Sequence, residues 1–129
     1  MSGAIARPRA TGSRLAFRTA ATAVPIMITG QFFLIGLAIF ADAAAFDLHR
    51  ALGGLVAVPV AASVALAFLL AELRPMRRGA ATLLALYVTQ ILWLELGEAT
   101  GLGTVQALHA LNAVFLMGAS VSLAERAGR

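Results

Sequence analysis

The sequence contains no cysteine and no lysine among its 129 residues, and charged residues make up only 12% of it. The absence of cysteine excludes disulfides, iron–sulfur clusters, thiolate-bound zinc and cysteine nucleophiles. The chain also lacks a Walker loop and a dinucleotide-binding glycine fingerprint, and no Ser–His–Asp set falls together in its predicted topology. What remains is a hydrophobic chain with two histidines, and these carry the functional interpretation.

Hydrophobic residues account for 60% of the chain, and the mean hydropathy is +0.89. A small soluble domain could not bury so much apolar surface, so lipid is the expected solvent. The sequence predicts an all-α integral membrane four-helix bundle over residues 18–124, with helices at about 18–41, 47–71, 80–96 and 104–123. Residues 1–17 are predicted to form a disordered basic cytoplasmic arm, and residues 125–129 a cytoplasmic tail.

The charges sort by side of the predicted membrane. Arginines occur in the N-terminal arm, in the turn after the second helix and at the C-terminus. The other side of the predicted membrane is acidic, and Arg50 is its single basic residue. By the positive-inside rule, both termini are cytoplasmic. We therefore expect a multi-pass protein of the bacterial cytoplasmic (inner) membrane. The same sidedness accounts for the pI of about 11.4 without a nucleic-acid partner.

The chain contains an internal repeat. Gln31 precedes His49 by 18 residues, and Gln90 precedes His109 by 19 residues. The glutamines are thus 59 residues apart and the histidines 60. Such self-similarity predicts two copies of a helical hairpin, related by an axis along the membrane normal. Each copy would place a histidine near the outer leaflet and a glutamine deeper on the preceding helix.

The paired histidines suggest a cofactor. On the second and fourth helices of a four-helix bundle, His49 and His109 can face each other across the bundle axis. This arrangement suits two neutral imidazoles that bind one heme iron from opposite sides, each with its other ring nitrogen held by an acceptor. Ordinary interfacial histidines are the alternative interpretation. Zinc fits less well, because it requires three or four ligands.

Five further residues are candidates for the wall of that site: Gln31, Gln90, Gly53, Asn112 and Arg50. The glutamines could equally form interhelical hydrogen bonds, and Gly53 could equally be a helix-packing glycine rather than space for a macrocycle. Asn112 could support His109 or simply join two helices. Arg50 could bind heme propionates or pair with a nearby carboxylate.

The runs HRALGG at residues 49–54 and LHALNA at residues 108–113, together with Gln90, resemble one four-helix half of the heme A synthase family. The resemblance covers roughly residues 28–122, and small uncharacterised four-helix bacterial membrane proteins share the Gln/His pattern. It implies that His49 and His109 are heme axial ligands on the outer side. The chain has one such half instead of two, lacks the paired outer cysteines of many members, and carries Phe46 where the family has an acidic residue. These differences favour heme binding over heme A synthase catalysis.

The sequence therefore predicts a small b-type heme-binding membrane protein, with heme b between His49 and His109. Its expected role is electron transfer, or that of a subunit in a redox complex, and no residue is predicted to be catalytic. The alternative is a heme-free accessory or structural subunit of a larger membrane protein complex. A homo-oligomer is a further possible assembly.

Overall fold

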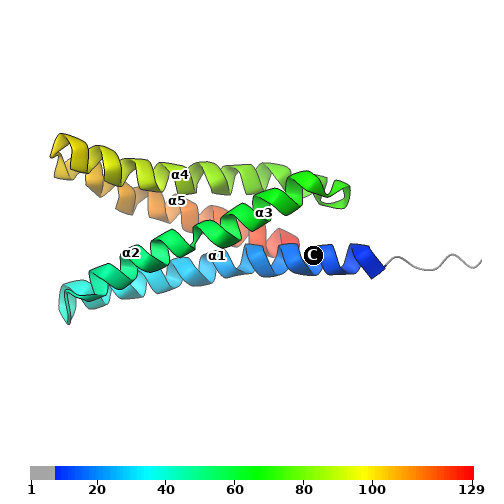
Figure 1. Cartoon of the computed structure of the whole chain (residues 1–129), viewed down its shortest axis with the longest axis horizontal. Coiled ribbons are helices and arrows are strands. Elements are labelled where there is room, and N and C mark those ends of the chain that lie inside the picture. Colours follow the sequence, from blue (N-terminus) through cyan, green and yellow to red (C-terminus); the bar gives the residue numbers. More distant parts are fainter. Residues whose placement is uncertain (1–7) are drawn as a thin grey trace, which may run out of the picture.

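The computed structural model describes residues 8–129, which contain five α-helices, one 3₁₀ helix and no strand. They form four long helical runs (Figure 1). The runs are α1 (Pro8–Phe40), α2 (Ala45–Leu55) continued by α3 (Ala57–Leu69), α4 (Arg77–Thr100) and α5 (Gly103–Ala127). The 3₁₀ helix η1 (Ala71–Met76) links α3 to α4.

All four runs are long and apolar enough to cross a membrane, and the shortest of these spans has 25 residues. At the helical rise, such a span is about 37 Å long, more than the hydrocarbon core of a bilayer requires. Large apolar side chains on the outside of the bundle, such as Ile26, Phe33 and Phe115, are well exposed. They would face lipid. The chain is accordingly a multi-pass membrane protein.

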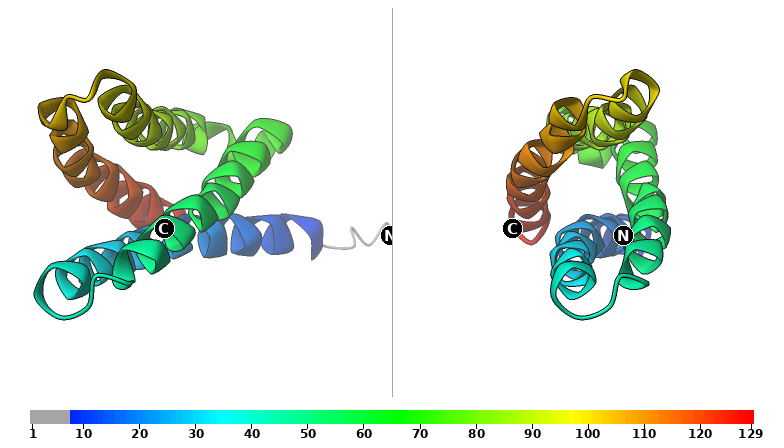
Figure 2. Two further views of the ribbon diagram at one scale, coloured as in Figure 1. Left: turned by 60° about the vertical axis from the view of Figure 1, so that its left-hand side comes forward. Right: turned by 90° about the vertical axis from the view of Figure 1, so that its left-hand side faces the viewer.

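The four runs form a ring (Figure 2, right). Helix α5 packs on α4 and α1, helix α3 packs on α1 and α4, and α2 packs on α1. The α2–α3 run and α5 therefore stand diagonally opposite each other. The connectors at residues 41–44 and 101–102 lie at the same end of the molecule, called here the connector end (Figure 1). The start of α1, η1 and the end of α5 lie at the opposite end.

The turn between α4 and α5 depends on two glycines. Gly101 adopts a left-handed conformation with φ 68°, and the amide of Leu102 donates to the carbonyl of Gly97 at 3.1 Å. This is the usual glycine-dependent end of a helix. A Cβ atom at Gly97 would lie only 2.7 Å from the backbone nitrogen of Gln106, so the two helices cross in close contact there.

The turn between α3 and α4 is held by Arg77. Its Nε donates to the carbonyl of Ala67 at 2.9 Å, and its Nη2 donates to the carbonyl of Phe68 at 2.8 Å. The guanidinium therefore satisfies carbonyls that the end of α3 leaves without helical partners, and its charge complements the helix dipole.

The apolar core lies mainly in the half of the bundle away from the connector end. Phe17, Val24, Val60, Leu83 and Leu123 are each at most 1% exposed and belong to one cluster. This packed half holds the four runs together. In the half nearer the connector end, hydrogen bonds of polar side chains such as Gln31 and Gln90 also join the helices.

The structure corrects the predicted start of the bundle. A disordered arm over residues 1–17 is wrong for residues 8–17, which form the first turns of α1, while residues 1–7 lie outside the described residues. The helix extends this far because Phe17 packs in the core at 1% exposure. In addition, the Ser13 hydroxyl donates to Glu72 Oε1 at 2.8 Å.

The other helix bounds also differ from the prediction. The single helix expected over residues 47–71 is interrupted at Val56, because Pro59 has no amide to donate to the carbonyl of Leu55. Helix α4 is longer at both ends than residues 80–96. Helix α5 continues to Ala127, so most of the predicted tail at residues 125–129 is helical.

Candidate functional site

Two matched Gln–His pairs lie toward the connector end. Gln31 Nε2 donates to the carbonyl of His49 at 3.0 Å, and His49 Nδ1 lies 3.2 Å from the carbonyl oxygen of Gln31. Gln90 Nε2 donates to the carbonyl of His109 at 2.9 Å, and His109 Nδ1 lies 3.0 Å from the carbonyl oxygen of Gln90. The same reciprocal contact thus joins α1 to α2 and α4 to α5. The predicted equivalence of the two pairs is present in the structure.

These contacts determine the tautomer of each neutral imidazole. A carbonyl oxygen only accepts hydrogen bonds, so Nδ1 of His49 and Nδ1 of His109 must carry the proton. Nε2 of each ring is then an unprotonated nitrogen with a free lone pair. Metal-binding histidines have this arrangement, with the other ring N–H held by a carboxylate or a backbone carbonyl.

The two rings approach each other from diagonally opposite helices. The ring centroids of His49 and His109 are 6.3 Å apart, and the ring planes make an angle of 68°. His49 lies in the second turn of α2, and His109 in the second turn of α5. The fold therefore brings together two side chains that are 60 residues apart in the sequence.

A cavity of about 490 Å³ surrounds the two rings. Its volume lies within the range of roughly 300–1,000 Å³ that is typical of ligand sites. Six of the predicted site residues line it: Gln31, His49, Arg50, Gly53, Gln90 and His109. Most of the remaining lining is aliphatic or aromatic, so the cavity is an apolar space with a few polar groups.

Asn112, the remaining predicted residue, does not line the cavity and lies behind Gln90. Its Nδ2 donates to the carbonyl of Leu86 at 2.9 Å and to Oε1 of Gln90. Both Asn112 and Gln90 are buried. Asn112 therefore positions Gln90, which in turn contacts His109.

The lining of the cavity follows the predicted internal repeat beyond the glutamines and histidines. Its lining residues match in pairs, 59 residues apart on α1 and α4 and 60 apart on α2 and α5. Besides the Gln and His pairs, these are Ile28 with Tyr87, Phe32 with Ile91, Ile35 with Leu94, Arg50 with Ala110, Gly53 with Ala113, and Val56 with Leu116. Gly54 and Gln106 are the lining residues without a lining counterpart. Adding the repeat offset of 59 or 60 to the number of each residue near the histidines would have predicted these pairs from the sequence.

In two of these pairs, one residue has a polar side chain and its counterpart an apolar one. Tyr87, paired with Ile28, donates its hydroxyl to the carbonyl of Gly53 at 3.0 Å, just before the interruption at Val56. Arg50, paired with Ala110, is highly exposed, and its Nη1 lies 3.6 Å from Oδ1 of the equally exposed Asp47. Such an exposed ion pair is weak. The guanidinium of Arg50 is thus available at the cavity.

The metal-ligating side chains near the cavity limit which metal ion or cofactor it could hold. Within residues 8–129, no group of three or more His, Asp and Glu side chains converges in a way that could hold a metal ion. A structural or catalytic zinc ion needs at least three protein ligands. The two imidazoles alone are one ligand short of such a zinc site.

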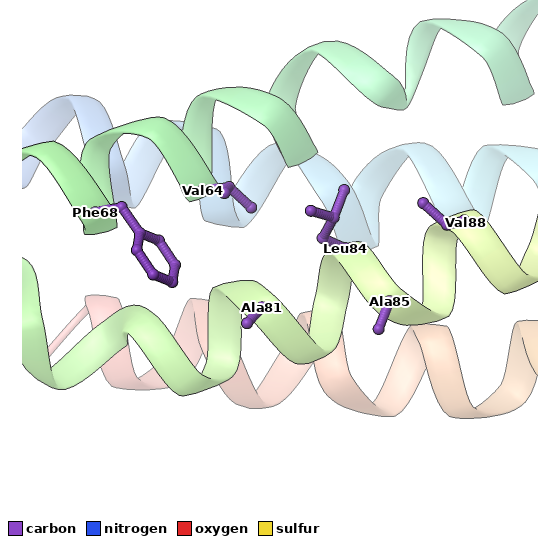
Figure 3. A pocket seen from close by; sticks show the side chains of 6 residues that line it. All are labelled: Val64, Phe68, Ala81, Leu84, Ala85 and Val88. Atoms are coloured by element: carbon purple, nitrogen blue, oxygen red, sulfur yellow. The ribbon is translucent and has the colours of Figure 1, made fainter.

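A second hollow lies between α3 and α4 and carries no such chemistry. It is an open groove of about 540 Å³, lined by Val64, Phe68, Ala81, Leu84, Ala85 and Val88 (Figure 3). None of these side chains has a polar atom. The groove offers neither a ligand nor a proton donor, so the histidine cavity is the candidate site.

Residues 31–97 match a protein family of unknown function, DUF6220. The chain belongs to this family. The matched segment of this DUF6220 member begins at Gln31 and contains the whole first Gln–His pair and Gln90, but it ends before His109. No curated protein and no solved structure matches the chain.

Proposed function

We propose that this DUF6220 protein is a small membrane protein that binds heme b between His49 and His109. The observation that carries the proposal is the pair of Nε2 lone pairs on rings whose centroids are 6.3 Å apart. A metal–imidazole bond of about 2 Å puts a ring centroid about 3 Å from the metal, so two rings on opposite sides of it are about 6 Å apart. The observed separation is close to that value.

The chain's own residues would each contribute to holding the group. The backbone carbonyls of Gln31 and Gln90 fix the Nδ1 protons and thereby keep each Nε2 free. Gly53 and Ala113, each one turn after a histidine, leave room beside the imidazoles. The apolar walls exclude water, and Arg50 provides a positive charge for a propionate.

Heme bound by two histidines supplies one-electron redox chemistry. The proposed role is therefore electron transfer, by the protein alone or as a subunit of a larger membrane redox complex. The matched lining residues support this role, because a flat group in the cavity would find one imidazole nitrogen on each side, from His49 and from His109.

We further propose that the protein lies in the bacterial inner membrane with both termini in the cytoplasm. Apart from Arg50, the described arginines occur near the start of α1, in η1, at the start of α4 and in the last turns of the chain. The connector end carries Asp42, Asp47, Glu95 and Glu98. By the positive-inside rule, the connector end and its cavity then face the outer leaflet.

The test is spectroscopic. The full chain, produced with heme supplied and purified in mild detergent, should show a Soret band that shifts on reduction with dithionite. The double variant His49→Ala/His109→Ala should lose that band. The matched control, Gln106→Ala, alters a polar cavity residue outside both Gln–His pairs and should keep it. An absent Soret band after heme supplementation, or full heme occupancy in the double variant, would overturn the proposal.

A second function, a heme-free accessory subunit, is favoured by one observation. No buried side-chain nitrogen or oxygen in the described part of the chain is without a hydrogen-bond partner, and each Gln–His pair already joins two helices. They could serve purely to join helices. A colourless protein that co-purifies with a stoichiometric membrane partner would establish this function instead.

A further inference from the structure

The two halves of the cavity hold their histidines differently. On the side of His109, Asn112 donates to both the carbonyl of Leu86 and Oε1 of Gln90, and Gln90 contacts His109 at two points. Asn112 and Gln90 are only 7% and 9% exposed. A continuous buried hydrogen-bond chain therefore fixes the position of His109.

The side of His49 lacks this support. Leu52 occupies the position equivalent to Asn112, 60 residues earlier, and a leucine has no hydrogen-bond donor. Within residues 8–129, the side-chain amide of Gln31 forms one hydrogen bond, to the carbonyl of His49, and its oxygen accepts none. Gln31 and His49 thus hold each other, and no other side chain of the described residues forms a hydrogen bond with the pair.

The helices that carry the histidines also differ. Helix α5 is uninterrupted over 25 residues and packs on both α4 and α1. Helix α2 has only 11 residues, packs mainly on α1, and ends at the interruption at Val56. The bond from Tyr87 to the carbonyl of Gly53 anchors its last turn. A small rotation of α2 about that anchor would move His49 while leaving the core in place.

From these three differences we propose that His109 is the fixed donor of the cavity and His49 the displaceable one. A neutral diatomic molecule such as carbon monoxide could then take the place of His49. This inference rests on the proposed heme function. His49 would leave as a neutral ring that keeps its Nδ1 proton, and the entering molecule would supply the replacing lone pair. No proton or electron is transferred in the exchange.

The first experiment needs no heme. In the full chain in detergent, labelled with ¹⁵N-histidine, the rate at which each ring Nδ1 proton exchanges with solvent is measured by NMR. The His109 proton should exchange about tenfold more slowly than the His49 proton, the effect of one additional hydrogen bond in the supporting chain. The two ring signals can be assigned from one folded variant in which either histidine is replaced, because only the signal of the other histidine remains. Equal rates, or the reverse order, would overturn the proposal.

The second experiment uses the heme-loaded, reduced protein and carbon monoxide. His49→Ala should keep its heme and bind carbon monoxide about tenfold faster than the wild type, whereas His109→Ala should lose most of its heme. Leu52→Asn, which places a side-chain amide at the position equivalent to Asn112, should slow carbon monoxide binding. The proposal is wrong if the two alanine variants behave alike and Leu52→Asn has no effect.

The two experiments separate the failure of this inference from the failure of the proposed function. A wild-type protein without a Soret band contradicts heme binding, and the exchange rates then still decide whether the two histidines are inequivalent. A Soret band combined with equal exchange rates contradicts the inference alone. Asn112→Leu is the matched variant for the exchange experiment, because it should raise the rate at His109 toward that at His49.

Discussion

Replacing Gly97 with alanine should weaken the crossing of α4 and α5. The added Cβ would lie 2.7 Å from the backbone nitrogen of Gln106 and would also meet its Cγ. Ordinary heavy-atom contacts are about 3.5–4.0 Å, so the helices would have to separate by about 1 Å. Because the contact is with backbone, no side-chain rotation can relieve it. Overpacking of this kind typically costs about 1–3 kcal/mol.

The matched control is Gly118→Ala, in the middle of α5. A Cβ at Gly118 would meet nothing within 4 Å. Both substitutions gain about 1 kcal/mol of helix propensity, so this gain cancels when the two variants are compared. We therefore expect Gly97→Ala to be less stable than Gly118→Ala by about 1–3 kcal/mol.

The free energy of unfolding can be measured in mixed micelles with increasing SDS. Far-ultraviolet circular dichroism would follow helix content, and the fluorescence of Trp93, the single tryptophan, would follow α4. Equal unfolding free energies for Gly97→Ala and Gly118→Ala would refute the close crossing. A second consequence is local: Gln106 precedes His109 by less than one turn, so Gly97→Ala should also displace that histidine.

Two further predictions concern the rest of the bundle. Tyr87→Phe removes the hydrogen bond to the carbonyl of Gly53 and should lower the free energy of unfolding by about 0.5–1.5 kcal/mol in the same assay, and an unchanged value would show that this bond contributes nothing. Because the chain has no native cysteine, single cysteines at Ala43 and Ala127 can report its orientation. In intact cells, a membrane-impermeant maleimide should label the cysteine at position 43 and not the one at 127, and the opposite pattern would reverse the proposed orientation.

Sequence reasoning predicted the four membrane-spanning runs and the meeting of the two histidines. Both follow from strong local signals: long apolar segments and a repeat that sets His49 and His109 at equivalent positions. The interruption at Val56 was missed, although Pro59 could have indicated it. The helical start of α1 was missed because it depends on burial of Phe17 against other helices, and local sequence does not reveal that burial.

The site was predicted in part. Gln31 and Gln90 were chosen as the deeper polar residues of the repeat, Gly53 as the small residue one turn after His49, and Arg50 as the only basic residue of the outer face, and all four line the cavity. The role of Asn112 could not be chosen from sequence, because its partner is a carbonyl 26 residues away on another helix. The apolar lining was not predicted, since aliphatic residues look alike in a membrane helix until the repeat offset is applied to each one.

The position of His109 on α5 has a consequence for the order of assembly in the membrane. Membrane helices can insert individually and pack afterwards, and the hairpin of α1 with α2–α3 can form before α4 and α5 have been synthesised. The cavity wall, however, draws on all four runs, and α5 both supplies His109 and closes the ring by packing on α1. Any molecule held by both histidines must therefore be acquired after the α5 segment has entered the bilayer. Loading with such a molecule would thus be a late event in the biogenesis of this protein.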